Sequence, residues 1–304
     1  CAFTLIIIFA GVQNGIERVS KIMMPILIVL SVIIAVYSVT RPGALAGVKY
    51  FLVPNVKNFS WMTVVSAMGQ MFYSLSIAMG ILITFGSYMK KDTAIEDSTR
   101  NVEIFDTGIA IMAGLMIIPA VFAFSGGDPD TLQAGPSLMF ITIPKVFQNM
   151  GFGTVIGIVF FLLVLFAAVT SSIALTESAV STFEDELGWG RKKATVLVGV
   201  IMLALGSLSS LGYGPLAGIK IIGMQFLDLF DFLTNSVMMP IAALLTSLFV
   251  SRVVGIDKIE AEIIHGESAF RRKKVFVVMI KYLCPVFAII ILLSSVANAL
   301  GWIK

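Results

Sequence analysis

The sequence predicts an all-α membrane protein. The 304 residues are 58% hydrophobic and 13% charged, whereas a typical soluble domain has about 25% charged residues. Mean hydropathy is +0.99, and apolar stretches long enough to cross a bilayer recur along the chain. The formal net charge is only +3, with no basic patch interleaved with aromatic residues, so a nucleic-acid partner is not expected.

Seven full spans and one partial span are expected, because a spanning helix needs about 20 mostly apolar residues. The predicted spans are 22–40, 60–89, 104–124, 152–181, 194–212, 222–251 and 275–302, after a partial one at 1–11. No basic segment precedes the apolar opening, which argues against a signal peptide. We expect the opening to be the end of a membrane helix, and the sequence to be a fragment.

Lysine and arginine predict the orientation, because cytoplasmic loops carry an excess of them. Alternate loops at 12–21, 90–103, 182–193 and 252–274 hold 14 such residues. The other loops, with Lys304, hold 6. The first set is therefore predicted to be cytoplasmic in a multi-pass plasma (inner) membrane protein, with the C-terminus outside.

The 60–89 span is interrupted by Tyr73-Ser74-Leu75-Ser76, with Gly80 shortly after. Broken backbone at membrane depth is tolerated where it lines a cavity or is buried in protein, and glycine-interrupted spans point to a transporter's binding site. Ser74 and Ser76 would offer hydroxyls and freed carbonyls to a cation, and Tyr73 and Met79 an apolar wall. The alternative is a continuous helix with a serine-rich packing face.

The 152–181 span places Ala167, Thr170, Ser171 and Leu175 on one helical face. Hydroxyl and carbonyl oxygens of this face suit a hard cation. The alternative is that the hydroxyls bond to carbonyls of their own helix, or pack helices closely.

Acidic side chains near span ends are Asp106, Asp228 and Asp231. Each is either functional or a solvated helix end. His265 is the single histidine and lies outside every predicted span, and Cys1 and Cys284 are the two cysteines. Neither a transition-metal site nor a catalytic set is expected, and the chain is not predicted to be an enzyme.

Two connections also carry predictions. The 125–150 connection is predicted to be external, and its apolar part from Leu138 to Phe147 is expected to fold back as a lid or short hairpin. The alternative is a disordered loop. Glu184-Asp185-Glu186 is interpreted as a solvated helix end, and Arg191-Lys192-Lys193 as a topology signal.

Long ordered motifs resemble the neurotransmitter:sodium symporters, in particular bacterial sodium-dependent amino-acid transporters with the leucine-transporter fold. GQMFYSLSIAMGILITFGSYMKKD resembles their broken sixth helix, and FFLLVLFAAVTSSIALTES followed by FEDEL their eighth. GIERVSKIMMP resembles the entry to the fifth, and DTGIAIMAGLMIIPAVFAF the seventh. The resemblance implies a truncated inverted-repeat bundle running from the end of helix 4 through helix 11.

Within one transmembrane domain at 1–304, the resemblance implies three parts. Residues 1–58 would end the first repeat, 59–251 would form the second, and 252–304 a cytoplasmic loop and the last helix. Helices 1–4 of the same protein would be missing partners of the site.

The resemblance also implies roles for single residues. The first sodium site would include Ser74 and Asp106, and the second Ala167, Thr170 and Ser171. The substrate pocket would be lined by Tyr73, Ser74, Ser76, Met79, Ser171 and Leu175, and Asp231 would belong to an extracellular gate. Because the Asp106 carboxylate adds fixed negative charge, chloride is not expected to be required.

The expected function is sodium-coupled import of an amino acid, hydrophobic or aromatic, by alternating access. The expected partners are the amino acid, Na⁺ and the lipid bilayer, with no organic cofactor. Two alternatives stay open: a proton-coupled amino-acid carrier on the same fold, with Asp106 as its proton site, and an amino-acid-sensing membrane protein that does not transport.

Overall fold

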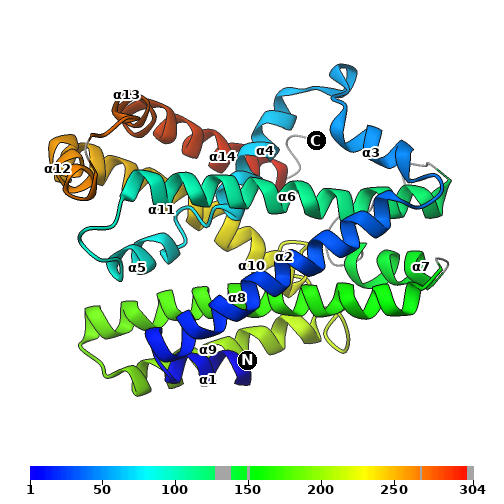
Figure 1. Cartoon of the computed structure of the whole chain (residues 1–304). Coiled ribbons are helices and arrows are strands. Elements are labelled where there is room, and N and C mark those ends of the chain that lie inside the picture. The colour runs from blue at the N-terminus through cyan, green and yellow to red at the C-terminus, as the bar shows by residue number, and fades with distance from the viewer. Residues whose placement is uncertain (127–137, 149–150, 268, 300–304) are drawn as a thin grey trace. The chain divides into compact units, whose positions relative to one another are not determined.

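The computed structural model describes residues 1–126, 138–148, 151–267 and 269–299. These residues are mostly helical, and extended pairing among them is confined to an isolated bridge between Ile221 and Met224 (Figure 1). The chain divides into two compact units. Unit 1 comprises Cys1–Leu5, Ser60–Glu103 and Ala174–Lys304, and unit 2 comprises Ile6–Phe59 and Ile104–Ile173.

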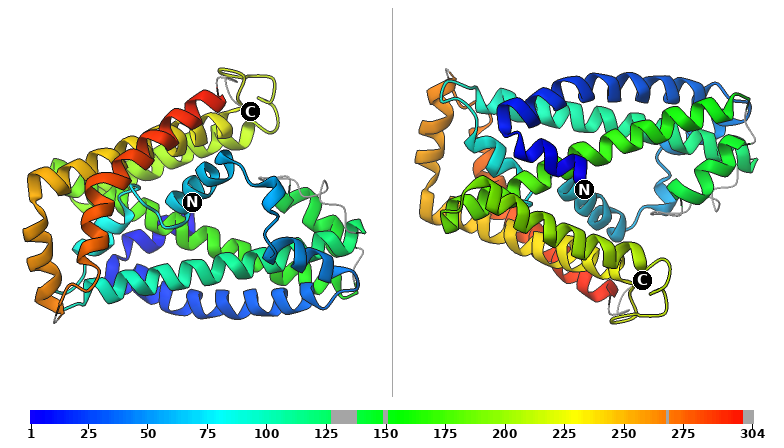
Figure 2. Two further views of the ribbon diagram at one scale, coloured as in Figure 1. Left: turned by 90° about the horizontal axis from the view of Figure 1, so that it is seen from above. Right: turned by 90° about the horizontal axis from the view of Figure 1, so that it is seen from below.

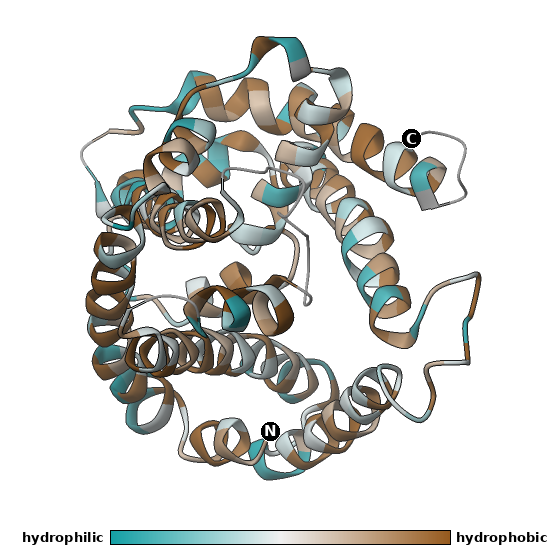
Figure 3. Ribbon diagram, turned by 90° about the vertical axis from the view of Figure 1, so that its right-hand side faces the viewer, coloured by the Kyte–Doolittle hydropathy of each residue, from teal (hydrophilic) through white to brown (hydrophobic). Residues whose placement is uncertain are grey.

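Six helices of the described part are long and apolar enough to cross a membrane. They are Val12–Val39, Ile95–Ser125, Gly153–Leu187, Arg191–Leu211, Phe226–Val254 and Lys273–Asn298. Apolar residues dominate these helices (Figure 3). Each overlaps a predicted span. The remaining predicted span, 60–89, is present as two short helices, α4 (Trp61–Ser74) and α5 (Ile81–Ser87).

Several predicted loops are helical in the structure. The π-helix η1 (Val12–Glu17) and the first turn of α2 (Arg18–Val39) fill the predicted 12–21 loop. Helix α6 (Ile95–Ser125) begins within the predicted 90–103 loop, and α8 (Gly153–Leu187) continues past residue 181. The boundaries were wrong for a physical reason: charged residues predict where a helix leaves the membrane, and a helix can continue into water beyond that point.

The core of unit 2 is formed where α2, α6, α7 (Ile143–Gln148) and α8 meet. Its buried members are Ile34, Ala35, Met116, Ala120, Val121, Ile143, Val146, Phe147, Ile156, Phe160 and Leu163. The rings of Phe147 and Phe160 pack edge to face with centroids 5.4 Å apart. The short π-helix η4 (Leu138–Thr142) leads into α7. The predicted fold-back of the segment from Leu138 to Phe147 is thus confirmed, while 127–137 and 149–150 of that connection lie outside the described residues.

Unit 2 also holds α1 (Ala2–Phe9, which begins in unit 1), α3 (Ala44–Leu52) and the 3₁₀ turn η2 (Val56–Asn58). Helix α3 lies directly against α6. A Cβ atom at Gly47 would lie 2.8 Å from the Cα of Pro119, closer than packed atoms tolerate, so glycine permits this approach. The rings of Tyr50 and Phe122 meet beside it, with centroids 5.0 Å apart.

Unit 1 contains two long helices that are each built from several segments. The first consists of α10 (Phe226–Asp231), η5 (Phe232–Met238), α11 (Met239–Leu248) and η6 (Phe249–Val254). The second consists of α13 (Lys273–Val278), η7 (Met279–Leu283) and α14 (Cys284–Ala299). Helix α12 (Ile256–Gly266) runs across the end of the first instead of continuing it (Figure 2). Helix α9 (Arg191–Leu211) also belongs to this unit.

A proline explains one of the π-helical segments. Pro285 lies at the second residue of α14, just after η7, and has no N–H to give to the preceding turn. The carbonyl of Ile280 in that turn instead accepts a hydrogen bond from the buried hydroxyl of Ser247 on α11, at 2.5 Å. The side-chain bond both satisfies the carbonyl and ties α11 to the last helix.

Candidate functional site

The predicted break in the 60–89 span is present, but it begins two residues later than predicted, because Tyr73 and Ser74 still belong to α4. Helix α4 ends at Ser74 and α5 begins at Ile81, leaving six non-helical residues between them. Three of these have positive φ: Ser76 at 54°, Ala78 at 63° and Gly80 at 79°. For residues other than glycine this conformation costs roughly 1–2 kcal/mol each. Such strain gathers at binding sites and switches because the surrounding fold must hold it in place.

Local hydrogen bonds explain how α4 stops. The N–H of Ile77 donates to the carbonyl of Phe72, and the N–H of Ser76 to that of Tyr73. This is the Schellman arrangement, whose left-handed residue is usually glycine. Here Ser76 occupies it, so a hydroxyl is retained at the break at the cost of backbone strain. The carbonyls of the last turn of α4 end at the gap, where the negative end of the helix dipole lies.

The second half of the broken helix, α5, is seated on the end of α8. Gly80 is the N-cap of α5 in the left-handed conformation, and a Cβ added there would lie 2.7 Å from the Oγ of Ser178. The hydroxyl of Thr84 on α5 donates to Ser178 Oγ at 3.3 Å and lies 3.3 Å from Ser181 Oγ. Glycine at position 80 therefore permits both the turn and the close approach of the two helices.

The residues predicted to line the substrate pocket differ in how far their side chains are buried. Tyr73 is 54% exposed and Leu175 50% exposed, while Ser74 and Ser76 are half-buried. Met79 is also half-buried, and it packs with Ile77 on the core cluster of Phe72, Met239 and Ile291. At least part of the Met79 side chain therefore belongs to this core.

The structure brings two predicted sodium ligands on α8 together. The hydroxyl of Thr170 lies 3.0 Å from the carbonyl oxygen of Ala167 and 3.1 Å from that of Phe166. The hydroxyl bonding to its own helix was one predicted alternative, and for Thr170 it is present. It does not remove the ligand role, because a hydroxyl that donates its proton keeps two lone pairs. Ser171, the next residue, is exposed.

The predicted acidic residues lie near helix ends or within α6. Asp106 is half-buried on α6, eleven residues after its first residue, Ile95. Asp231 is exposed at the end of α10, where its carboxylate accepts a hydrogen bond from the Asn235 amide at 2.6 Å. Asp228 is exposed one turn earlier. Tyr73, Ser74, Ser76, Met79, Leu175 and Asp231 belong to unit 1, and Asp106, Ala167, Thr170 and Ser171 to unit 2.

One ion cluster was missed by the sequence analysis. Glu177 on α8 is completely buried, and both of its carboxylate oxygens face the guanidinium of Arg191, at 2.5 and 3.1 Å. The hydroxyl of Tyr88, at the end of α5, donates to Glu177 Oε1 at 2.8 Å. Glu184 also contacts Arg191, at 3.3 Å. The available signal was a lone acid inside the predicted 152–181 span. Arg191 was interpreted only as a topology signal.

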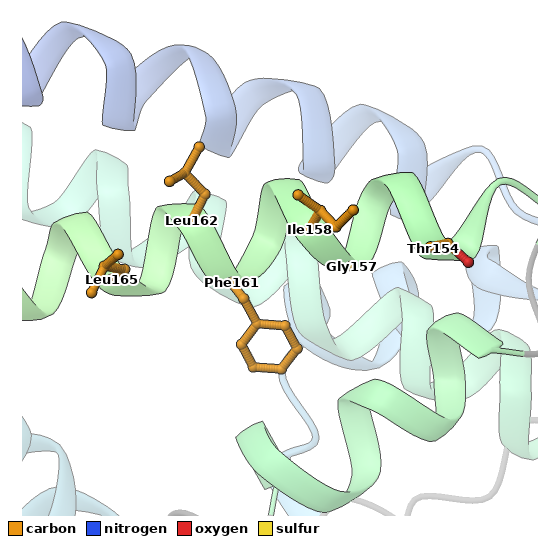
Figure 4. A pocket seen from close by; sticks show the side chains of 6 residues that line it. All are labelled: Thr154, Gly157, Ile158, Phe161, Leu162 and Leu165. Carbon is orange, nitrogen blue, oxygen red and sulfur yellow. The ribbon is translucent and has the colours of Figure 1, made fainter.

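A shallow groove on α8 lies apart from these residues. It is lined by Thr154, Gly157, Ile158, Phe161, Leu162 and Leu165, all from the first half of that helix (Figure 4). Its walls are almost entirely apolar, and it ends before Ala167. It lacks the polar groups that would orient a solute, so the break and the Thr170 face remain the better candidates.

Comparison with known proteins identifies the family. Residues 1–301 match the sodium:neurotransmitter symporter family. The chain belongs to this family. Members of the sodium:neurotransmitter symporter family are transporters, not enzymes. The predicted family is confirmed.

Relatives within the sodium:neurotransmitter symporter family are similarly described. An uncharacterized sodium-dependent transporter of Bacillus subtilis, YhdH, is 34% identical over 296 residues, which is 97% of this chain and 65% of that protein. An uncharacterized sodium-dependent transporter of Haemophilus influenzae is 31% identical over 292 residues, or 95% of this chain and 62% of that protein. The chain therefore spans just under two thirds of the length of these two relatives.

A solved structure supports the fold. The crystal structure of MhsT in complex with L-phenylalanine matches with a TM-score of 0.83 and 35% identity. The match covers 97% of this chain and 66% of that one. The predicted all-α, leucine-transporter-type fold class is thereby confirmed.

Proposed function

We propose that the protein containing this chain is a sodium-coupled symporter that imports an amino acid by alternating access. The observation that carries the proposal is the break between α4 and α5, held open by left-handed Ser76 and Ala78. A helix that crosses a membrane gains nothing from such strain unless the break serves a site. Membership in a family of sodium symporters supports sodium coupling at this site.

The amino acid would bind at the break. In this proposal Ser74, Ser76 and backbone carbonyls at the break meet its polar end, and Tyr73 and Met79 form the apolar wall. Ser171 and Leu175 on α8 complete the lining. The similarity to MhsT, whose crystal structure holds L-phenylalanine, supports a hydrophobic or aromatic substrate. The flexible thioether of Met79 can adapt to such a side chain.

The second sodium site would be built on α8. The carbonyl of Ala167 and the hydroxyl of Thr170, 3.0 Å apart, form two oxygen ligands, and the Ser171 hydroxyl is the third. Alkali cations, like other hard cations, prefer such oxygens. The first sodium site is assigned to Ser74 and Asp106 by family resemblance. With Asp106 supplying a negative charge, transport is proposed not to need chloride.

Sodium coupling supplies enough free energy for concentrative uptake. Moving one positive charge inward is worth about 2.3 kcal/mol per 100 mV. A tenfold sodium gradient adds about 1.4 kcal/mol per ion. Two ions therefore provide roughly 7 kcal/mol, which could sustain a substrate gradient of several powers of ten. Asp231 is proposed as part of the gate that closes the outer side during this cycle.

Uptake measurements test the function. The full-length protein in proteoliposomes would be given a panel of radiolabelled amino acids with an inward sodium gradient, then with potassium in place of sodium. We expect uptake of one or a few apolar amino acids only with sodium. Uptake that ignores sodium and follows a pH gradient would replace the proposal with the proton-coupled carrier. Binding without uptake would indicate a sensor.

The α8 site has its own test. Thr170→Val combined with Ser171→Ala removes two oxygen ligands while conserving volume at position 170, and should abolish sodium-stimulated uptake at normal expression. Thr170→Ser retains the hydroxyl and should retain uptake. Ser209→Ala is the matched control, since Ser209 on α9 also bonds to its own helix, at 3.0 Å from the Leu205 carbonyl. An unchanged half-saturating sodium concentration in the double variant would refute the assignment.

A further inference from the structure

The start of α6 lacks a capping side chain of its own. The residue at its N-cap position is Ala94, whose methyl group cannot accept a hydrogen bond. The cap comes instead from Glu267, at the end of α12 and far along the chain. Its Oε1 accepts hydrogen bonds from the backbone N–H groups of Glu96 at 2.6 Å and Asp97 at 3.3 Å. These are the second and third helical residues, whose N–H groups an N-cap side chain normally satisfies.

The contact is reciprocal. Oε2 of Glu96, in the first turn of α6, accepts a hydrogen bond from the backbone N–H of Arg271 at 2.9 Å. Arg272 reaches the same helix through its side chain, lying 2.9 Å from Glu103 and 3.9 Å from Glu96. The hydrogen bond that Arg272 donates to the Glu103 carboxylate raises the pKa of the Arg272 guanidinium. The carboxylate of Glu267 therefore binds the start of α6, and the carboxylate of Glu96 binds the backbone just before α13.

The backbones of the two segments also touch. A Cβ atom at Gly266 would lie 2.5 Å from the carbonyl oxygen of Thr93 and 3.3 Å from the nitrogen of Ala94. The first distance is too short for any side chain, so the close contact requires glycine. We call this arrangement the clasp; it consists of Thr93, Glu96 and Asp97 on one side and Gly266, Glu267 and Arg271 on the other.

The clasp lies next to the second half of the broken helix. Only residues 88–94 separate the last residue of α5, Ser87, from the first residue of α6, Ile95. The near end of this connector is held by Tyr88, which donates to the buried Glu177. Its far end is held by the clasp. Both ends of a seven-residue connector are thus fixed within unit 1, which restricts where α5 can lie.

We propose that the clasp positions α5, the second half of the broken helix, and that Glu267 and Glu96 are positioning residues for transport. The clasp joins the connector to the arm formed by α12 and α13. None of its members belongs to the proposed substrate or sodium sites. Its effect on transport rests on the proposed function, whereas its effect on the connector does not.

Hydrogen–deuterium exchange tests the structural part without any transport assay. In the full-length protein, Glu267→Ala should speed exchange of amides in peptides covering residues 88–100 at least tenfold. Glu262→Ala is the matched control, because Glu262 is an exposed acid on the same helix, and should leave that exchange unchanged. Equal exchange in wild type and Glu267→Ala would overturn the clasp. If Glu267→Ala does not fold, the milder Glu267→Gln, which keeps one acceptor oxygen, should show a smaller rise in the same peptides.

A rescue variant separates positioning from simple helix capping. Ala94→Asp supplies a local N-cap and, added to Glu267→Ala, should restore slow exchange at Glu96 and Asp97. It does not restore the link to α12. We therefore expect sodium-driven uptake to stay at least threefold slower than wild type in both variants, with the half-saturating sodium concentration changed less than twofold. Wild-type turnover in Glu267→Ala, or its recovery with Ala94→Asp, would overturn the positioning role. Absence of uptake by the wild type would refute the proposed function and leave the exchange result standing.

Discussion

Single side chains show most clearly which features of this chain are costly and therefore informative. Glu177 is a fully buried carboxylate, and a buried charge is tolerated only when it is paired and hydrogen-bonded. The guanidinium of Arg191 pairs with this carboxylate, and the hydroxyl of Tyr88 donates a hydrogen bond to it. Three elements, α5, α8 and α9, are joined at this one carboxylate.

We expect Glu177→Ala to destabilise the protein strongly, by about 3 kcal/mol, because it leaves Arg191 without its main partner in a largely buried position. The measurement is the midpoint of thermal unfolding in detergent. Glu184→Ala is the control, because Glu184 contacts the same guanidinium only at 3.3 Å, and its removal leaves the closer pair of Arg191 with Glu177 intact. The loss of Glu184 should cost under about 1 kcal/mol. Equal shifts in the two variants would contradict this account.

The strained backbone at Ala78 makes an unusual prediction for an alanine-to-glycine change. With φ at 63°, Ala78 adopts a conformation that glycine reaches freely, so Ala78→Gly should stabilise the protein by up to about 1 kcal/mol. Ala67→Gly within the regular helix α4 should instead cost about 1 kcal/mol. Thermal unfolding of the two variants should shift in opposite directions. A shift of the same sign would mean that the left-handed conformation is not strained.

Helix α5 is held in position by its contacts with other parts of the chain. It has seven residues, too few for a stable isolated helix. Its place is set by Gly80 against Ser178, by Thr84, and by Tyr88.

Gly80→Ala should disturb this seating. The new methyl group would meet Ser178 Oγ at 2.7 Å, and φ at 79° would add strain. The expected cost is about 1–2 kcal/mol, together with a loss of sodium-driven uptake. Gly86→Ala is the matched control within the same helix, since nothing lies within 4 Å of the new atom, and should be neutral or stabilising. Comparable losses from both substitutions would show that the loss does not arise from the contact of Gly80 with α8.

At the level of the whole molecule, the predicted orientation follows from loop charges and has a direct test. Helix α9 has 21 residues, which at 1.5 Å per residue span about 30 Å, the thickness of a hydrocarbon core. Its two ends should therefore face opposite sides of the membrane. Lys192 precedes the apolar part of α9 and Ile222 follows the helix in an exposed turn.

We expect Lys192→Cys to react with a membrane-impermeant thiol reagent only in inside-out vesicles. Ile222→Cys should react in intact cells. Both substitutions would be made in the full-length protein after its native cysteines, including Cys1 and Cys284, are replaced. The control is the cysteine-free protein, to which neither new cysteine has been added. The opposite labelling pattern would reverse the predicted orientation and place the C-terminus inside.

The membrane class, the existence of a break within the 60–89 span and the oxygen-bearing face of α8 were all predictable, because they depend on local composition and on spacing along one helix. Helix ends beyond the apolar spans, such as the start of α6 at Ile95, could not be predicted, because polar residues do not by themselves end a helix. Glu177 with Arg191, and Glu267 with Glu96, depend on residues that are distant in sequence. Their pairing requires knowing which elements pack together. The strained φ of Ser76 and Ala78 likewise arises because contacts on both sides of the break hold a backbone that neither residue would adopt alone.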